Sequence, residues 1–182
     1  PRSTPKPSSA ASDVYKRQLH NIANTILGIL FVPTLLGTII HLRQLDHIYY
    51  SNITMILFIS VWLCDTAAFI FGTKFGKKKI LPNISPKKSW VGSISGFIAS
   101  VSTFFIAFKL DYLGGNYSLN DSLVFGFISG VFGQFGDFGE SLIKRDVGVK
   151  DSGDILRGHG GILDRVDGMI FVFPFCYLIS LI

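Results

Sequence analysis

Residues 53–72 read ITMILFISVWLCDTAAFIFG and contain a single charged side chain, that of Asp65. A transmembrane helix needs about 20 consecutive, mostly apolar residues, so this stretch predicts a membrane span. A carboxylate inside a span is costly to bury, which makes Asp65 a candidate functional residue. The alternative is an acidic residue near the cytoplasmic end of the helix, hydrated or paired with a lysine of the next loop.

The whole chain has the composition of a membrane protein. Of its 182 residues, 48% are hydrophobic and only 16% are charged, and the mean hydropathy is +0.45. Further apolar runs cover residues 21–40, 90–108, 123–138 and 169–182. Gly126 and Gly130 form a GxxxG pair, which suits closely packed membrane helices. We therefore predict an all-α, polytopic membrane helical bundle with about five transmembrane helices. Cys64 and Cys176 lie in apolar runs and give no metal-site spacing.

Basic residues are distributed unevenly among the predicted loops. Residues 41–52 and 109–121 contain one basic residue each, whereas residues 140–167 contain five. Residues 74–89 carry six lysines, namely Lys74, Lys77, Lys78, Lys79, Lys87 and Lys88. Cytoplasmic loops of membrane proteins carry an excess of Lys and Arg, so the two basic loops are predicted to face the cytoplasm.

The N-terminal residues differ from the rest of the chain. Residues 8–18, SSAASDVYKRQ, are identified as the translation of a transposon adapter used in sequencing libraries. We therefore expect residues 1–18 to be a non-native, disordered scar, with native sequence missing upstream of residue 19. The alternative is a native disordered tail. Without residues 1–18 the net charge falls from +5 to +2, which gives no case for nucleic-acid binding.

Residues 80–90, ILPNISPKKSW, form a candidate anion site. Lys87 and Lys88 stand between Pro86 and a Gly-rich helix, and backbone N–H groups at a helix start can bind phosphate. Lys77, Lys78 and Lys79 are interpreted as ordinary positive-inside charge instead.

The largest group of ionisable residues lies between residues 135 and 168, FGDFGESLIKRDVGVKDSGDILRGHGGILDRVDG. Asp137 and Glu140 are three residues apart and share a helical face, which Lys144 continues one turn later. Asp164 and Asp167 repeat this spacing. Two acidic pairs around a glycine-rich turn suit a divalent cation with an anionic ligand, and carboxylate oxygens favour Mg²⁺. The alternative is a solvated cytoplasmic loop whose charges balance.

Other common site types are not present in the sequence. It contains no Cys/His cluster for zinc, no GxSxG element for acyl transfer and no GxxxxGK[ST] phosphate loop.

The acidic and basic motifs resemble those of the phosphatidate cytidylyltransferase family, also called CDP-diacylglycerol synthases. The family signature is matched by Ser141, Lys144-Arg145, Lys150-Asp151, His159-Gly160-Gly161, Asp164-Arg165 and Asp167. The upstream segments WLCDTAAFIFGTKFGKKK and SPKKSWVG are also similar to the family, so the resemblance covers residues 53–182. The family's N-terminal spans are missing, and residues 19–182 are expected to be a C-terminal membrane catalytic domain.

The resemblance implies transfer of a cytidylyl group from CTP to phosphatidic acid, giving CDP-diacylglycerol and pyrophosphate. It implies a Mg²⁺-dependent site, with room for a monovalent cation such as K⁺ beside it. The metal ligands carried over by position are Asp137, Asp164 and Asp167. The catalytic candidates are Lys144, Arg145, Asp151, His159 and Arg165. The substrate-binding candidates are Asp65, Ser85, Lys87, Lys88, Lys150, Gly160 and Gly161. For His159, a structural hydrogen bond beside Gly160 and Gly161 is an equal alternative.

The implied setting is phospholipid biosynthesis in a lipid bilayer, with the active site facing the cytoplasm of a bacterial inner membrane and a homodimer as a candidate assembly. Two alternatives remain open from the sequence. One is a CTP-dependent kinase of a polyprenol or phytol-type lipid, and the other is an ion-coupled membrane transporter.

Overall fold

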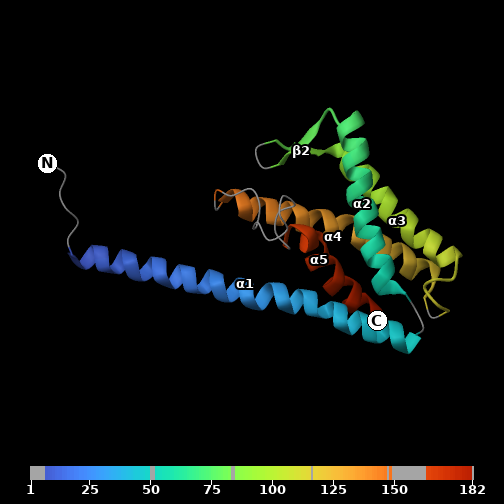
Figure 1. The fold of residues 1–182 in the computed structure, drawn as a ribbon, viewed down its shortest axis with the longest axis horizontal. Coiled ribbons are helices and arrows are strands. Elements are labelled where there is room, and N and C mark those ends of the chain that lie inside the picture. The colour runs from blue at the N-terminus through green and yellow to red at the C-terminus, as the bar shows by residue number, and fades with distance from the viewer. Residues whose placement is uncertain are drawn as a thin grey trace. The chain divides into compact units, whose positions relative to one another are not determined.

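A computed structural model describes residues 7–49, 52–82, 85–115, 117–146, 148 and 163–181 of the chain. The chain divides into two compact units, Pro1–Leu35 and Leu36–Ile182. The helix α1 (Pro7–Tyr49) runs across the boundary between them, and Pro33 lies inside it (Figure 1).

The first unit is helical wherever the structure describes it. Residues 7–18 belong to α1. Residues 8–27 contain neither Pro nor Gly, so nothing interrupts the helix before the apolar run that follows. The expected disorder of residues 1–18 stays a prediction. The adapter origin of the segment stays a prediction.

Over its described residues, the second unit contains four further helices, α2 (Ile53–Phe75), α3 (Trp90–Lys109), α4 (Leu119–Asp146) and α5 (Leu163–Ser180). Consecutive helices pack against one another, α2 on α3, α3 on α4 and α4 on α5. Each of the five apolar runs predicted as a span is therefore helical over its described residues, apart from Leu181 at the end of the final run.

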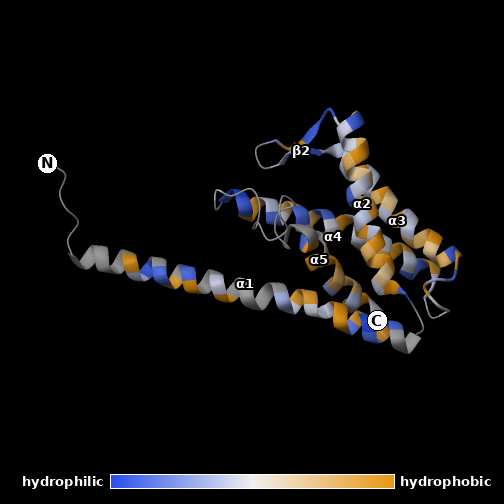
Figure 2. Cartoon of the chain, in the orientation of Figure 1, coloured by the Kyte–Doolittle hydropathy of each residue, from blue (hydrophilic) through white to orange (hydrophobic). Residues whose placement is uncertain are grey.

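Two helices within the described residues, Ile53–Phe75 and Trp90–Lys109, are long and apolar enough to cross a membrane. Only 39% of the apolar stretch of α2 and 28% of that of α3 is buried inside the protein, whereas the core helix of a soluble protein is mostly buried. Figure 2 shows hydrophobic colouring along both helices. Trp62, Phe69 and Ile98 are among their exposed apolar side chains. These helices indicate membrane association, and the predicted number of five spans is not confirmed by them.

A short hairpin corrects the all-α prediction. Strands β1 (Lys79–Leu81) and β2 (Ser85–Ser89) pair antiparallel, with Lys79 opposite Ser89 and Leu81 opposite Ser85. The backbone N–H of Trp90 donates to the Lys78 carbonyl over 3.1 Å and continues the pairing into the first residue of α3. The strands are too short and too basic to show an alternating apolar pattern. Lys87 and Lys88 lie on β2, which leads directly into α3. Figure 1 shows the hairpin at this end of the helix.

Small residues set the distances between the helices. A Cβ on Gly92 would lie 2.6 Å from the Ala68 carbonyl oxygen of α2, and one on Gly126 would lie 2.8 Å from the Val101 Cα of α3. A Cβ on Gly130 would lie 3.1 Å from another backbone atom of α3, so the predicted packing role of the GxxxG pair is confirmed. The buried hydroxyls of Ser60 and Ser129 hydrogen-bond over 2.9 Å in the same region.

Polar side chains satisfy the backbone where α2 and α4 begin. The Asp46 carboxylate, 3% exposed, accepts hydrogen bonds from the N–H groups of Ile53 and Thr54 over 2.9 and 3.0 Å. At the start of α4, Asp121 accepts from the N–H and hydroxyl of Ser118, and the Ser118 hydroxyl accepts from the Asp121 N–H. Such caps satisfy N–H groups that have no partner within the helix.

Gly136 and Gly139, three residues apart on α4, provide a test of the close approach of α4 and α5. A Cβ on Gly136 would lie 2.3 Å from the Asp167 carbonyl oxygen, whereas a Cβ on Gly139 would meet nothing within 4 Å. We predict that Gly136→Ala destabilises the protein by about 1–3 kcal/mol through overpacking. Gly139→Ala, the control, should be neutral or stabilising by up to about 1 kcal/mol because Ala favours helix. Unfolding in detergent measures both, and equal stabilities would contradict the close approach.

Candidate active site

One cavity of about 550 Å³ collects several of the residues singled out from the sequence. It is bounded by the C-terminal half of α2, the hairpin, the start of α3 and the cytoplasm-predicted half of α4. Its polar lining includes Asp65, Lys79, Lys87, Lys88, Gln134 and Asp137. The cavity therefore joins segments that lie up to 73 positions apart in the sequence, from Asp65 to Phe138.

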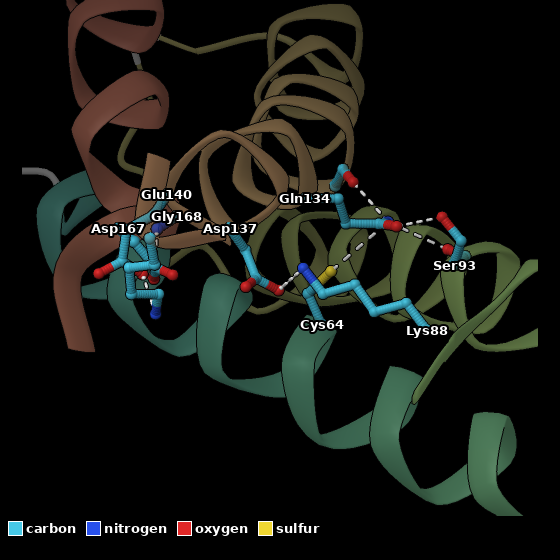
Figure 3. Close-up of polar contacts among 10 residues, drawn as sticks. Cys64, Lys88, Ser93, Gln134, Asp137, Glu140, Asp167 and Gly168 are labelled. Carbon is cyan, nitrogen blue, oxygen red and sulfur yellow. Dashed lines mark hydrogen bonds and ion pairs between the residues drawn. The ribbon is translucent and has the colours of Figure 1, made fainter. Parts of the chain in front are cut away.

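An ion pair crosses the cavity between the hairpin and α4. The Lys88 Nζ lies 2.5 Å from Oδ2 of Asp137 (Figure 3). The same nitrogen lies 4.0 Å from the centre of the Phe138 ring, within the range of a cation–π interaction. The side chains are 24% and 37% exposed, so the pair is partly shielded from water and is less screened than a surface pair.

Asp65 lines the same cavity from α2. The sequence left open whether it is paired with a lysine of the following loop. No ion pair between Asp65 and a lysine is found in the described part of the chain. Asp65 is exposed, so the alternative of a hydrated carboxylate stays open, and its functional role stays a prediction.

The start of α3 is less available to an anion than its sequence suggested. The Ser89 hydroxyl accepts a hydrogen bond from the Gly92 N–H over 3.2 Å, and the Trp90 N–H donates to the Lys78 carbonyl oxygen. Two N–H groups of the first turn are therefore satisfied within the protein. The lysine side chains at the cavity, rather than the helix start, carry the capacity for anion binding.

Gln134 is a cavity residue that the sequence reasoning missed. Its Nε2 donates to the carbonyl oxygens of Gly130 and Ser93 over 2.7 and 3.0 Å, and its Oε1 accepts from the Ser93 hydroxyl (Figure 3). These bonds join α3 to α4 one helical turn before Asp137. The signal that could have revealed it is a single amide side chain in an apolar, Gly-rich stretch, three residues before the candidate ligand Asp137.

A second acidic cluster lies between α4 and α5. Glu140 is 8% exposed, and its Oε2 accepts from the Lys144 Nζ over 3.0 Å, as their spacing on one helical face predicted. Its other oxygen, Oε1, is buried and accepts no hydrogen bond from any described group. Asp167 lies beside it, as Figure 3 shows, and accepts the Gly168 N–H over 2.7 Å.

These carboxyl groups lie close enough to affect one another's ionisation. Burial, then the contact with Glu140 and the charge of Asp137, raises the pKa of the Asp167 carboxyl to about 8. Full ionisation of the cluster is therefore unfavourable, and either a shared proton or a bound cation stabilises it.

The structure tests only some of the predicted site residues. Asp65, Lys87, Lys88 and Asp137 meet in the cavity, whereas Ser85 lies on β2 outside its lining. Lys144 and Arg145 lie in the last turn of α4, outside the cavity lining. Asp164 and Arg165 belong to α5, but their side chains lie outside the description. The remaining predicted residues lie outside the described residues: Lys150, Asp151, His159, Gly160 and Gly161.

Metal coordination stays a prediction. Within the described residues, no group of three or more His, Cys, Asp or Glu side chains is arranged to hold a metal ion. Of the three predicted ligands, Asp137 and Asp167 are described and the side chain of Asp164 is not.

Comparison with known proteins shows to which family the chain belongs. Residues 9–182 match the model of the cytidylyltransferase family. The chain belongs to this family, which confirms the resemblance found in its motifs.

Three relatives illustrate the similarity. The chain is 35% identical over 162 residues to the phosphatidate cytidylyltransferase of Haemophilus influenzae, covering 84% of this chain and 56% of the relative. It is 42% identical over 129 residues to that of Thermotoga maritima, covering 69% and 47%. It is 47% identical over 124 residues to the chloroplastic phosphatidate cytidylyltransferase 4 of Arabidopsis thaliana, covering 68% and 31%. The chain thus spans about a third to just over half of these relatives.

The Gln134 network predicts an energetic coupling between α3 and α4. Gln134→Leu should destabilise the protein by about 1–3 kcal/mol, because the Ser93 hydroxyl and two carbonyl groups lose their partner. Ser93→Ala should cost less in the background of the Gln134→Leu variant than in the wild type. Unfolding of the two single variants and the double variant in detergent measures the coupling, and strictly additive effects would contradict it.

Proposed function

We propose that this protein transfers a cytidylyl group from CTP to phosphatidic acid, forming CDP-diacylglycerol and pyrophosphate. The observation that carries this proposal is the cavity in which Lys87 and Lys88 meet Asp65 and Asp137 beside the ends of apolar helices. It supplies cationic groups for phosphates and carboxylates for a divalent cation. The names of the relatives, phosphatidate cytidylyltransferases, support the choice of substrates.

In the proposed reaction, a phosphate oxygen of phosphatidic acid forms a bond to the α-phosphorus of CTP. The bond from that phosphorus to the bridging oxygen breaks, and pyrophosphate leaves with the electron pair. A phosphate monoester is largely dianionic at pH 7, so the attacking oxygen needs no general base. The protein contributes positioning and charge neutralisation.

The cavity lining suits these tasks. Lys87 and Lys88 are point charges for phosphate oxygens. Phe69, Ile80 and Phe138 form an apolar wall that suits the lipid side of the substrate. Among the motif residues that carry over from the family, Lys144, Arg145, Lys150 and Arg165 are proposed to bind phosphate groups. His159 is proposed to donate to a phosphate oxygen, and Gly160 and Gly161 to allow close backbone approach.

The chemistry of the described carboxylates supports Mg²⁺ as the proposed cofactor. The Glu140 Oε1 is a buried acceptor without a described hydrogen-bond donor, and Asp167 beside it has a raised pKa, so the Lys144 ammonium does not satisfy the cluster fully. Oxygen ligands of this kind are those that Mg²⁺ prefers. Asp137 and Asp167, with Asp164, are proposed to hold it, and Asp151 is a further candidate. When bound, the cation supplies neutralisation of phosphate charge. A K⁺ ion beside it is part of the same proposal.

The proposed arrangement in the membrane has five spans, with the hairpin and residues 140–167 on the cytoplasmic side of a bacterial inner membrane. The distribution of lysines and arginines supports it. A homodimer is the proposed assembly.

The orientation is testable by cysteine labelling in intact cells. Cys64 and Cys176 are buried and compete little with introduced thiols. We predict that Lys77→Cys, in the basic hairpin region, is protected from a membrane-impermeant maleimide until the cells are opened. Gly115→Cys, where a Cβ meets nothing within 4 Å, should react in intact cells and serves as the control. The reverse pattern of labelling would contradict the proposed orientation.

Radioactive CTP tests the reaction in membranes that carry the protein. We expect Mg²⁺-dependent transfer of α-label, and not of γ-label, into phosphatidic acid. Asp137→Asn and Asp164→Asn should reduce this transfer by about 100-fold or more, because loss of a ligand removes several kcal/mol of charge stabilisation. Asp111→Asn is the matched control. Asp111 lies in a turn with φ 58°, which Asn tolerates, and it is outside the cavity lining.

Three other results would count against the proposal. Near-normal turnover in both Asn variants would show the metal assignment to be wrong. Transfer of γ-label to a polyprenol or phytol would indicate a lipid kinase. Ion flux without nucleotide turnover would indicate a transporter.

A further inference from the structure

Two positively charged partners can bind the single carboxylate of Asp137. It is the proposed ligand of a divalent cation, and it is the partner of Lys88, whose Nζ lies 2.5 Å away. A carboxylate in direct contact with an ammonium group is partly neutralised, so a divalent cation gains less from binding it. The arriving cation and the Lys88 ammonium therefore compete for the same carboxylate.

Lys88 is held in a place from which it can move. It is on β2, next to the residue that caps α3, and its aliphatic stem carries the ammonium onto the Phe138 ring. The side chain is 24% exposed and lines the cavity. A lysine is a point charge on a flexible stem of four carbons, and it can exchange one anionic partner for another within its reach.

The other charges of the cavity show where the ammonium would go. Asp65 is the only other acidic residue of the described lining, and Lys79 and Lys87 are further cations. A phosphate that enters beside these lysines brings the negative charge that Lys88 loses when a cation takes Asp137. The geometry thus contains the first partner of Lys88, Asp137, and a lysine-lined cavity that suits a phosphate as the second.

We propose that Lys88 occupies the place of the cation on Asp137 while the site is empty, and that it transfers to a phosphate oxygen of the substrate when a divalent cation takes Asp137. The identity of the phosphate rests on the proposed function, whereas the exchange on Asp137 does not. Because each binding step frees the partner that the other step needs, cation and phosphate bind cooperatively, and this coupling is reciprocal.

The static alternative is that the ion pair only fastens the hairpin to α4. In that case the cation does not bind Asp137, and removal of the lysine charge leaves cation affinity unchanged or, by loosening the site, makes it weaker. Under the exchange, removal of the same charge frees Asp137 and strengthens cation binding. The two readings therefore predict opposite signs for one measured quantity.

Mn²⁺ binding without nucleotide measures that sign, by electron paramagnetic resonance of free Mn²⁺ over the purified protein in detergent. We expect Lys88→Met to bind Mn²⁺ on the order of tenfold more tightly than the wild type, and Asp137→Asn to bind it more weakly. Lys79→Met is the matched control. It removes the same charge from the same cavity lining, but the Lys79 ammonium lies 3.5 Å from the Lys87 carbonyl oxygen and has no described ion pair with Asp137.

The effect of Lys79→Met should be at most about twofold, since a charge without direct contact acts only through the screened field. Equal tightening in both lysine variants would overturn the exchange in favour of a general field effect. Unchanged or weaker binding by Lys88→Met would overturn it in favour of the static pair. Absence of Mn²⁺ binding to both the wild type and Lys88→Met would also overturn it.

Lysine acetylation of the wild type, read by mass spectrometry, keeps the test decisive even if Lys88→Met fails to fold. Lys88 should be protected in the empty protein, become several-fold more reactive at saturating Mn²⁺, and be protected again when CTP is added. Lys74, which is exposed at the end of α2 and outside the cavity lining, is the reference within the same molecule. Constant reactivity of Lys88 across the three states would overturn the exchange.

The Mn²⁺ measurements use neither CTP nor phosphatidic acid. A protein that makes no CDP-diacylglycerol can still show the exchange, and an active enzyme can fail to show it. The proposed exchange and the proposed reaction can therefore be disproved independently of each other.

Discussion

The close approach of helix backbones is the constraint on which the rest of the structure depends. Gly92 and Gly126 allow α3 to lie against α2 and α4 at distances that a Cβ would prevent, and Gly136 does the same between α4 and α5. In lipid there is little hydrophobic force between helices, so contact of this kind and a few interhelical hydrogen bonds carry the association. The positions of the cavity and of the second acidic cluster both follow from it.

The charges of the site lie where this packing leaves room for them. Asp137 comes one residue after Gly136, and it meets Lys88 because the hairpin turns back over the start of α3. Glu140, one turn further on, is enclosed between α4 and α5 and retains a carboxylate oxygen without a described donor. The protein therefore places buried carboxyl groups between α4 and α5 and gathers lysines at the cavity beside the hairpin. This separation is what a site for a cation and phosphates needs.

The helices themselves were predictable because each is encoded locally. An apolar run long enough for a membrane has few conformations other than a helix, since its backbone groups must be satisfied within the segment. The hairpin was not predictable in this way. Its strands span three and five residues, and the lysines of β2 reflect the cavity and the membrane surface rather than a pleated pattern. Residues 7–18 form a continuous helix with the apolar run that follows them, and no local apolar pattern in these residues predicted it.

The sequence by itself determined the apolar helices and the family, because hydropathy and motif spacing are properties of short segments. It also placed Glu140 and Lys144 on one helical face, where they form an ion pair. Only the tertiary structure decided that Lys88 pairs with Asp137, that Gln134 joins α3 to α4, and that Asp167 lies beside Glu140. These contacts join residues from 27 to 49 positions apart, and no local preference specifies them. They arise from helix packing, in which the smallest side chains determine which charged ones meet.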